Sequence, residues 1–578
     1  MPVSVIEGES LLAVDIGNVN TRAALFDIVD GEYRFLATAC VPSTAMAPWN
    51  DVTEGVRQAL EVLQQLIEHP LLTPNRQLIL PTQEDGSGVD GLVVTASAGR
   101  ALKTVLVGLL NDVSLQSARH LAESIPGVIL DTIHLHDQRR FEKQIDAILA
   151  LQPDLLLITG GVDGGASRSV LHLVEAAGLG VYLLPEEKRP AILYAGNAAL
   201  AKEIRESLAP YARFLQIAPN VRPSLDEEDL LPAQHALAEL CTTLRRQELR
   251  GMEELFQWSG GHMLPTHYAE ARLVRFLSQT LGAGRSILAV DLGASTTSLL
   301  LGHDGQTFAR VLPLGVGEPL PQLLNQIKAE DILRWTHFDL PSHRVIDFAY
   351  QKAIYPQMIS VTQEELSLEL AFAREILRQG MRELRQSYPE VLPPFPVLEM
   401  ILVSGATLTR LAHFGPALLA VLDAIQPAGL SSVLLDPNGL LPMLGAAAGR
   451  NSLIPVHVLE SNALINLGTV VSVVASGAYG TPVLKVQLTY ENGTEARLDV
   501  RHGNLEVIPL PAESTARLKL QPASHVDIGL GRGRGGTFTI TGGLMGVIID
   551  ARGRPLGLPE DVIRRRELAK KWLWTLGG

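Results

Sequence analysis

The sequence has few cysteines and no long apolar run. Cys40 and Cys241 are its only cysteines, so neither a disulfide framework nor a cysteine-based metal site is expected. No apolar stretch reaches the roughly 18 residues that a membrane-spanning helix requires. The segment from Met1 to Ser10 also lacks the basic and apolar regions of a signal peptide. We therefore expect a cytoplasmic protein without a membrane segment.

Positive charge is also scarce. The 48 Lys and Arg residues are outnumbered by 62 Asp and Glu residues, which gives a formal net charge of −14. A surface of this sign repels polyanions, so nucleic acid is not expected as a ligand. The chain has no Gly-x-x-x-x-Gly-Lys-Ser/Thr motif, which excludes P-loop chemistry as far as a sequence can exclude it.

Apolar residues are plentiful and follow a pattern. They make up 46% of the 578 residues, enough for several hydrophobic cores. Short runs rich in Val, Ile, Leu and Ala alternate with amphipathic stretches, which is typical of parallel strands covered by helices. Ligands of open α/β sheets bind beyond the carboxyl ends of such strands, so functional residues are expected directly after each run. The predicted strands are 11–14, 92–95, 155–159, 192–195, 287–290 and 401–404.

The pattern changes beyond Arg450. Strands follow one another there without intervening helices and are separated by turn residues such as Asn492-Gly493, which predicts a small β-sandwich or barrel. We therefore expect four parts. They are an N-terminal α/β lobe (1–250), a second α/β lobe (251–452), a β-rich domain (453–556) and a C-terminal helix (557–578).

A first candidate phosphate loop follows the strand at 11–14. Gly17 lets backbone N–H groups turn toward a phosphate, and Asn18 and Thr21 are able to donate hydrogen bonds to it. Asp15 is placed to hold Mg²⁺ through water. Taken alone, the same residues also describe an ordinary hairpin turn.

A second candidate loop follows the strand at 287–290. Its hydroxyls are suited to terminal phosphate oxygens, and Asp291 is suited to orient the water shell of a metal or an attacking water. A plain turn is again the alternative, but two such hairpins in one chain strengthen each other. The expected phosphate-binding residues of this loop are Gly293, Ser295, Thr296 and Thr297.

The last of the predicted α/β strands opens into Gly405 and Ala406. Small residues at this point let a flat adenine or ribose approach the backbone, although helix–strand packing alone also favours glycine. The same order occurs earlier, where Asp15 is followed by Gly160 and Gly161, and we assign these glycines to nucleotide binding as well. Either two related halves or a chance repeat of short motifs explains this echo.

These motifs resemble those of a known superfamily. Asp-x-Gly, a second Asp-x-Gly followed by hydroxyls, and Gly-small-Thr, in this order, resemble the actin, sugar-kinase and heat-shock-chaperone ATPases. Further segments resemble the glutamate mutase accessory family, called GlmL or MutL and unrelated to the mismatch-repair protein of that name. The resemblance covers about Leu11 to Gly449 and implies a two-lobed, ribonuclease H-like ATPase fold. The segments are 95–99, 157–165, 194–197 and 423–427.

The resemblance also implies a function. It suggests an accessory or chaperone-like factor that binds ATP or ADP with Mg²⁺ and helps to release damaged corrinoid from an adenosylcobalamin-dependent mutase. Nucleotide would then open and close the lobes and change the affinity for this protein partner. Asn18, Val19 and Asn20 stand where the family has a run of Ser and Thr, and Arg22 replaces a Lys. We therefore expect slow ATP hydrolysis or none.

Two alternatives remain open at this point. A small-molecule kinase on the same fold needs a base beside its acceptor group, and no residue is identified for that role. A non-hydrolysing, actin-like scaffold would use nucleotide structurally and recruit partners through the β-rich domain.

Overall fold

The computed structural model describes residues 9–577. Its first lobe contains a five-stranded sheet around β1 (Leu11–Ile16), a strand whose side chains are all buried. On one side, β1 pairs with the antiparallel β2 (Asn20–Val29), which pairs with β3 (Glu32–Pro42). On the other side, β1 is parallel to β4 (Gly91–Ala96), and β4 is parallel to β10 (Met263–Pro265).

The second lobe repeats this arrangement. β11 (Ser286–Leu292) pairs antiparallel with β12 (Thr297–His303), and β12 pairs with β13 (Gln306–Leu312). β11 is also parallel to β14 (Met400–Ser404), and β14 is parallel to β15 (Gly429–Asp436). The order β3-β2-β1-β4-β10 therefore matches β13-β12-β11-β14-β15 in sequence and direction. This repeat confirms the predicted two-lobed α/β ATPase fold.

The repeat also corrects the echo drawn from the sequence. The counterpart of β14, which ends before Gly405, is β4, because both lie parallel to the strand that carries the Asp-x-Gly motif. The end of β4 leads to Gly99, not to Gly160 and Gly161. Pairing these two glycines with Gly405 and Ala406 was therefore wrong.

Two helices lie between the lobes. Residues of α8 (Thr266–Thr280) and α15 (Leu440–Ala447) form one hydrophobic core with residues from both β1 and β11. The helices cross closely at Gly445, where an added Cβ would lie 1.8 Å from the carbonyl oxygen of Ala269. The two lobes thus share a packed hinge.

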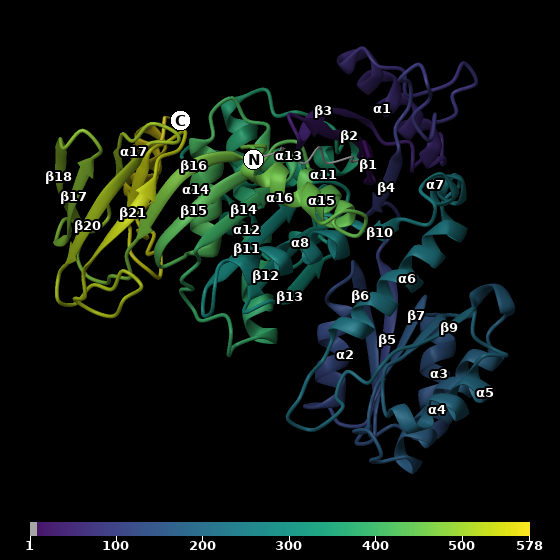
Figure 1. Cartoon of the computed structure of the whole chain (residues 1–578). Helices are drawn as coiled ribbons and strands as arrows, with labels where there is room; N and C mark the ends of the chain where they lie inside the picture. Colours follow the sequence, from purple (N-terminus) through teal and green to yellow (C-terminus); the bar gives the residue numbers. More distant parts are fainter. Residues whose placement is uncertain (1–8, 578) are drawn as a thin grey trace.

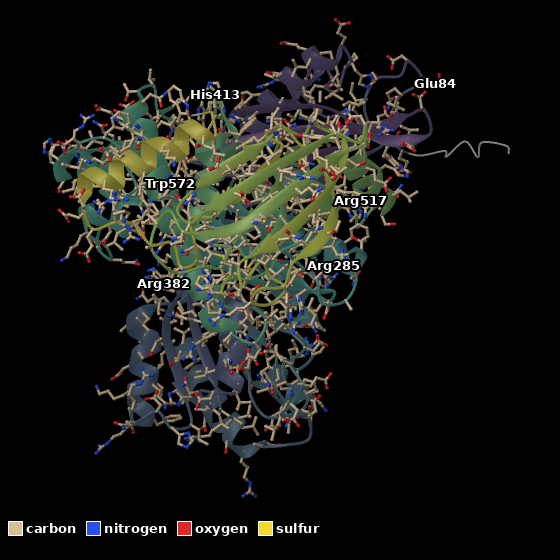
Figure 2. The ribbon with its side chains drawn as sticks, turned by 90° about the vertical axis from the view of Figure 1, so that its left-hand side faces the viewer. Glu84, Arg285, Arg382, His413, Arg517 and Trp572 are labelled. Carbon is tan, nitrogen blue, oxygen red and sulfur yellow. The ribbon has the colours of Figure 1, made fainter. Side chains whose placement is uncertain are left out.

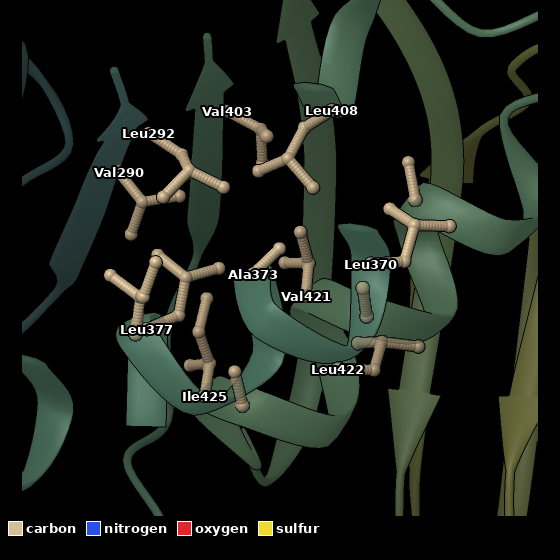
Figure 3. Close-up of a cluster of buried hydrophobic side chains, with 14 of the residues drawn as sticks. Val290, Leu292, Leu370, Ala373, Leu377, Val403, Leu408, Val421, Leu422 and Ile425 are labelled. Carbon is tan, nitrogen blue, oxygen red and sulfur yellow. The ribbon is translucent and has the colours of Figure 1, made fainter. Parts of the chain in front are cut away.

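The outer face of the second sheet is covered by α12 (Gln363–Ser387) and α14 (Gly415–Ile425), whose apolar side chains interdigitate (Figure 3). α12 begins sharply because Thr362 and Glu365 form a capping box. It also packs directly on the sheet, since a Cβ at Gly380 would lie 2.2 Å from a methyl carbon of Leu299.

The chain between β4 and β10 forms a separate parallel sheet, which we call the inserted domain (residues 102–248; Figure 1). Its strand order is β6-β5-β7-β8-β9, the doubly wound order in which the first strand lies between the second and the third. Its strands are β5 (Leu102–Gly108), β6 (Gly127–His134), β7 (Leu155–Ile158), β8 (Ala191–Tyr194) and β9 (Phe214–Ile217). Its helices are α2 (Ser114–Ala122), α3 (Phe141–Leu151), α4 (Arg168–Leu183), α5 (Ala201–Leu208) and α6 (Leu231–Glu248), with short 3₁₀ turns at Glu186–Lys188 and Ala198–Leu200.

The C-terminal strands form two layers. β16 (Ile465–Ser472), β22 (Val547–Asp550) and β19 (Leu505–Ile508) extend the second lobe's sheet to eight strands. A four-stranded sheet packs against this extension around a core of its own, beside the C-terminal helix α17 (Val562–Thr575; Figure 2). It contains β17 (Pro482–Tyr490), β18 (Glu495–Arg501), β20 (Thr515–Pro522) and β21 (Gly536–Thr541). The predicted domain boundaries stay proposals.

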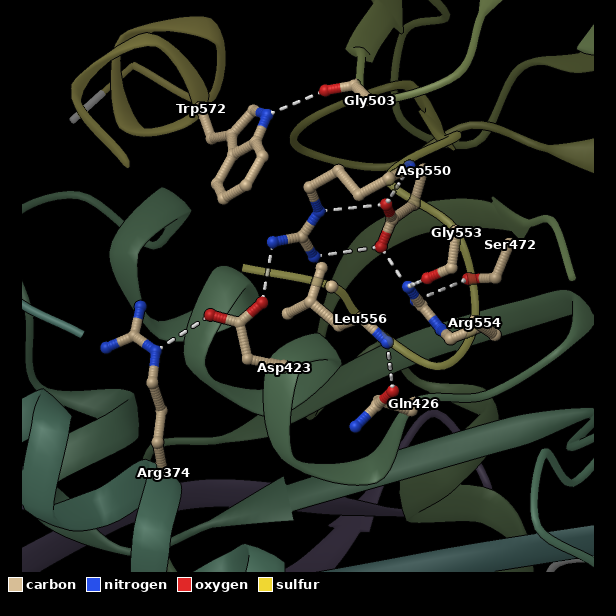
Figure 4. A network of polar contacts seen from close by, with 12 residues as sticks. Arg374, Asp423, Gln426, Ser472, Gly503, Asp550, Gly553, Arg554, Leu556 and Trp572 are labelled. Atoms are coloured by element: carbon tan, nitrogen blue, oxygen red, sulfur yellow. Dashed lines mark hydrogen bonds and ion pairs between the residues drawn. The ribbon is translucent and has the colours of Figure 1, made fainter. Parts of the chain in front are cut away.

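A buried polar cluster, here called the junction network, ties this C-terminal part to the second lobe (Figure 4). Arg552 donates to both Asp423 and Asp550, at 2.6 and 2.9 Å. Arg374 donates a hydrogen bond to the second oxygen of Asp423 at 2.8 Å, and Arg554 donates one to the second oxygen of Asp550 at 2.7 Å. All five side chains are buried, and each has at least one partner of opposite charge.

The remaining helices are short or peripheral. They are α1 (Val52–Ile67), α7 (Met252–Trp258), α9 (Leu320–Leu323), α10 (Ala329–Leu333), α11 (Ser342–Ile354), α13 (Ala406–Thr409) and α16 (Leu453–Glu460). In the part of the chain that the structure describes, none of the helices combines the length and apolar composition needed to cross a membrane.

Candidate functional site

A cleft of about 560 Å³ opens between the two lobes. Both Asp-x-Gly hairpins and the turn after β14 line it, together with the segment 356–363. Residues from distant parts of the chain thus meet in one place. The predicted site residues that line the cleft are Asp15, Gly17, Asn18, Asp291, Gly293, Ser295, Thr296, Gly405 and Ala406.

The two hairpin turns have the same geometry. The N–H of Gly17 donates to the carbonyl of Asn20 at 2.9 Å, and the N–H of Gly293 donates to that of Thr296 at 3.0 Å. A Cβ at Gly17 would lie 3.1 Å from the Asn20 oxygen, and one at Gly293 would lie 2.7 Å from the Thr296 oxygen. Both turns are therefore tight enough to favour glycine.

The turn after β14 is just as restrictive. Gly405 has a φ of 99°, and an added Cβ would lie 2.1 Å from the carbonyl oxygen of Leu292. The chain then enters the one-turn helix α13, in which Thr407 donates to Glu369 at 3.0 Å. This turn therefore brings bare backbone to the cleft wall, directly beside the second hairpin.

Asp15 is held rigidly in the cleft. Its Oδ1 accepts hydrogen bonds from the hydroxyls of Thr95 at 2.7 Å and Thr266 at 2.8 Å. Its Oδ2 lies 3.8 Å from a terminal nitrogen of Arg22. One carboxylate oxygen is thus fixed by a strand and a helix, while the other faces a cation.

Four carboxyl groups crowd beneath the hairpins, and we call them, with Arg22, the cleft floor. They are Asp15, Asp291, Glu270 and Asp436. Burial raises the pKa of Asp291 to about 6; Asp15 and Asp436 add to this rise, while Arg22 and a hydrogen bond with Ser404 oppose it. Burial and the neighbouring acids likewise raise the pKa of Glu270 well above its usual range. Acidic groups therefore outnumber the single basic group here.

Two floor carboxyls are only half satisfied. Glu270 is 1% exposed and accepts from the Ser298 hydroxyl at 2.9 Å through Oε2, while Oε1 has no hydrogen-bond partner among residues 9–577. Asp436 is 2% exposed and accepts from the N–H of Leu441 at 2.8 Å through Oδ2. Its Oδ1 also lacks a partner within the described chain. Unpaired buried polar atoms are rare and require an explanation.

Arg22 is the cation of the floor. It extends from β2 toward the second lobe, where a Cβ at Gly439 would lie 3.0 Å from its Nη1. Burial works against its charge, but the carboxylates, led by Asp15, raise the pKa of Arg22 above its usual value. The residue that replaces the Lys of the resembled family thus links the two lobes electrostatically.

Contacts between the hairpins close one end of the cleft. The side-chain amide of Asn18 donates to Ser295 Oγ at 3.1 Å and to the carbonyl of Gly99 at 3.2 Å. Thr296 Oγ1 lies 3.4 Å from Nε2 of His267. Burial lowers the pKa of His267 to about 4, so this ring is neutral at physiological pH.

Four predicted site residues do not line the cleft. Thr21 is buried against α1, within 3.2 Å of where a Cβ of Gly55 would lie. Thr297 Oγ1 donates to the carbonyl of Leu314 at 2.7 Å. Gly160 and Gly161 lie after β7 in the inserted domain, and their roles in nucleotide binding stay predictions.

Several residues of the site were missed from the sequence. Lys352 lines the cleft and pairs with Glu369 at 3.0 Å, and both side chains are buried. Neither residue carries a motif, because both come from helices. Asp436, in contrast, ends a predictable apolar strand, so the rule that selected Asp15 and Asp291 would also have selected it.

The residues fit a nucleotide whose metal is held through water. Among residues 9–577, no three His, Cys, Asp or Glu side chains are arranged to hold a metal ion directly. The carboxyl groups at the ends of β1 and β11 face the cleft below two glycine turns. Water-mediated binding is the mode that Mg²⁺ commonly adopts beside phosphates.

Two solved structures resemble this chain weakly. The ethanolamine utilization protein EutJ from Carboxydothermus hydrogenoformans is 12% identical, with 77% of this chain and 91% of that one covered and a TM-score of 0.28. A diol dehydratase-reactivating factor in nucleotide-free form is 11% identical, with 78% and 99% covered and a TM-score of 0.30. These TM-scores are low, so the assignment of the fold rests on the strand order described above.

Sequence comparison identifies a family. Protein MutL from Clostridium tetanomorphum is 24% identical over 302 residues, which are 52% of this chain and 59% of that protein. The matched part thus spans a little over half of the relative's length. The family model described as MutL protein matches residues 11–463, which include both hairpins, the inserted domain and the hinge helices. The chain belongs to the MutL protein family.

Proposed function

We propose that this protein is an ATP-binding accessory factor that reactivates an adenosylcobalamin-dependent mutase, with slow or absent ATP hydrolysis. One observation carries the nucleotide part: two equivalent glycine hairpins and a bare backbone turn meet in one cleft between duplicated lobes. The role toward a mutase is supported by membership of the MutL family. The matched residues 11–463 include every residue that lines the cleft.

The phosphates are assigned to the two hairpins. Ser295 and Thr296 present hydroxyls at the cleft, and Lys352 brings positive charge to the same space. Asp15 and Asp291 would hold Mg²⁺ through water, and bound Mg²⁺ would supply neutralisation of the phosphate charge. Gly405 and Ala406 would border the adenosine, because neither residue has a side chain larger than a methyl group.

Slow hydrolysis follows from the surroundings of the carboxyl groups. Glu270 is almost completely buried and bonded to Ser298, and it does not line the cleft. One oxygen of Asp15 accepts hydrogen bonds from two threonine hydroxyls, and the other lies near Arg22. Neither group is free to orient an attacking water and also take its proton, which efficient phosphoryl transfer to water requires.

Nucleotide is expected to act through the angle between the lobes. Asn18 and Ser295 already connect the hairpins across the cleft, and phosphates inserted between them would replace this hydrogen bond with contacts to both loops. The lobes would then rotate about the core of α8 and α15. A ligand that contacts the two states differently shifts their populations in this way.

The partner is assigned to an exposed apolar stripe near the cleft. Ile346, Tyr350 and Ile354 follow one another at four-residue spacing on α11 and are all exposed. The stripe continues into Ile359 and Val361, which also line the cleft. Exposed apolar patches of this kind mark protein contacts, and this one adjoins the nucleotide site, so nucleotide binding would change its shape.

Calorimetric titration tests the nucleotide part. ATP and ADP with Mg²⁺ are titrated into the wild type, Asp15→Ala, Asp291→Ala and the control Asp146→Ala, a surface change on α3, while phosphate release is followed in parallel. We expect the wild type and Asp146→Ala to bind both nucleotides with little turnover, and the two cleft variants to bind at least tenfold more weakly. If the wild type binds neither nucleotide, the proposal fails.

A reactivation assay tests the partner. An adenosylcobalamin-dependent glutamate mutase, inactivated by damaged corrinoid, is incubated with the protein, ATP, Mg²⁺ and fresh coenzyme. We expect activity to return with the wild type, and to return much less with Tyr350→Glu, which places a charge in the stripe without touching the cleft. Recovery that is equal with and without the protein would contradict the accessory role.

A further inference from the structure

A second hollow adjoins the cleft at the start of α12. It has a volume of about 250 Å³ and is bounded by the start of α12, the segment after α10 and the C-terminal helix α17. Gln363 and Leu366 line both spaces, so one turn of α12 separates them. Its volume is below the roughly 300 Å³ at which sites for drug-sized ligands begin. It therefore suits a ligand much smaller than a nucleotide.

The hollow is lined by basic groups. Arg374, Lys570 and His337 contribute to its wall, and none of the described residues that line it is acidic. Burial lowers the pKa of His337, and the charges of Lys570 and Arg374 lower it further. The two cations therefore lie close enough to keep this ring neutral, and its buried Nδ1 has no partner within residues 9–577.

Arg374 has unused hydrogen-bonding capacity at this point. Its side chain is 4% exposed, and in the described chain its only hydrogen bond runs from Nε to Asp423 at 2.8 Å. Figure 4 shows the two terminal nitrogens turned away from Asp423. A guanidinium offers a planar fork that matches a carboxylate. A buried arginine with a free fork is a natural anchor for an anion.

The remaining walls are aromatic. Trp335 is buried, and its indole N–H is already satisfied by Glu375 at 2.6 Å, so its ring presents apolar surface only. Phe338 lies nearby, and Trp574 on α17 is 84% exposed although it lines the hollow. An exposed tryptophan at the mouth of a basic, aromatic hollow is well placed to stack on a flat ligand.

We propose that this hollow is a binding site for a small aromatic carboxylate. The carboxylate would meet Arg374 and Lys570, and the ring would lie against Trp335 and Trp574. The site is distinct from the cleft and does not depend on the proposed nucleotide binding. A phosphate-bearing ligand of larger size is disfavoured by the volume.

Titration calorimetry with indole-3-acetate as the probe tests this site. The full-length wild type should bind the probe with a stoichiometry of one. The neutral analogue indole-3-acetamide should bind at least tenfold more weakly, because a charge-assisted hydrogen bond contributes roughly 1.5–3 kcal/mol and each 1.4 kcal/mol corresponds to about tenfold. The absence of binding at millimolar probe, or equal binding of acid and amide, would overturn the proposal.

Matched variants locate the bound probe. Lys570→Gln should weaken binding about tenfold, whereas Lys571→Gln should leave it unchanged, because Lys571 bonds to Asn504 at 3.0 Å and does not line the hollow. Trp574→Ala should weaken binding severalfold without affecting the fold. Asp291→Ala should retain full binding. Loss of binding in Asp291→Ala, or equal loss in the two lysine variants, would place the probe elsewhere and contradict the assignment.

Discussion

The protein contains two clusters of buried charge that are built on opposite principles. In the junction network, three arginines face two aspartates, and each carboxylate oxygen has a basic partner. In the cleft floor, one arginine faces four carboxyl groups, and oxygens of Glu270 and Asp436 have no partner among residues 9–577. The carboxylates of one cluster are therefore fully paired within the protein alone, while those of the other are short of basic partners and of hydrogen-bond donors.

This difference separates structure from function. A buried network whose carboxylates are fully paired holds two parts of the chain in one arrangement without the help of a ligand. A buried cluster with unpaired oxygens costs stability, and it persists where a ligand or ion compensates it. Burial of charge alone would not have distinguished the two clusters. The number of carboxylate oxygens without a hydrogen-bond partner distinguishes them.

The largest effect is expected from breaking the junction network. Asp550→Asn leaves Arg552 and Arg554 without their shared carboxylate, and loss of one partner from a buried ion pair costs about 3–5 kcal/mol. Chemical denaturation followed by fluorescence of Trp572, which packs over Arg552, measures the loss. The control Glu495→Ala removes an exposed ion pair with Arg497 and should cause no measurable change.

The pH dependence of the stability of Asp550→Asn tests the same ion pairs in a second way. Burial opposes the charge of Asp550, but Arg552 and Arg554 hold its pKa well below the usual range. A depressed carboxyl pKa stabilises the fold above the unfolded pKa, about 3.9, and this stabilisation is lost as the pH falls through the folded value. The difference between wild type and Asp550→Asn should therefore be constant from about pH 8 to 5 and shrink only below about pH 4. A difference that already shrinks at pH 6 would contradict the assignment.

The next effect concerns the cleft and requires ligand. ATP with Mg²⁺ at roughly 100 times its Kd should stabilise the folded protein by about 2.7 kcal/mol. Hydrogen exchange should slow in the two hairpins and in α8 and α15, and remain unchanged around Asp550. Protection that spreads equally over both clusters would show that the junction network is not complete without ligand.

The sequence predicted much of the cleft because its residues follow the ends of strands. Asp15, Asp291 and Gly405 all directly follow or end buried apolar runs, and parallel strands place such ends at one edge. Glu270 and Lys352 could not be found in this way. They lie on helices and follow no strand end, so only packing shows which way they point.

Strand alternation explains why two of the predicted hairpin hydroxyls do not line the cleft. Asp15 is directly opposite Arg22, and Asp291 is directly opposite Ser298. Directly opposite residues share a face of the sheet, so the preceding Thr21 and Thr297 point to the other face. Their roles in binding phosphate stay untested predictions, but the hairpin register places Arg22 and Ser298 nearer to the floor.

A smaller loss of folding stability is expected when the cleft floor loses its only arginine, Arg22. Arg22→Met should destabilise the nucleotide-free protein by about 2 kcal/mol, within the range for leaving buried acceptors unpaired. The cost is below that at the junction because Glu270, Asp291 and Asp436, whose pKa values are already raised, are able to take up protons and relieve the repulsion. Thermal unfolding checks this, with the exposed Arg285→Met as the control. A loss as large as that of Asp550→Asn would mean that both clusters depend on complete pairing.

The smallest effect, and the sharpest contrast, is expected at Glu270. Glu270→Gln is the same chemical change as Asp550→Asn, yet the unfolding free energy should change by less than about 1 kcal/mol, and in the stabilising direction. The raised pKa of Glu270 means that the folded protein already favours its neutral form, which glutamine imitates, and the Ser298 hydroxyl is able to donate to the amide oxygen as it does to Oε2. Denaturation at pH 7 measures the difference against Glu270→Ala, which removes the same carboxyl but leaves a cavity beside α8. A destabilisation of several kcal/mol in the glutamine variant would show that the ionised carboxylate is paired in the protein alone, and the distinction between the two clusters would disappear.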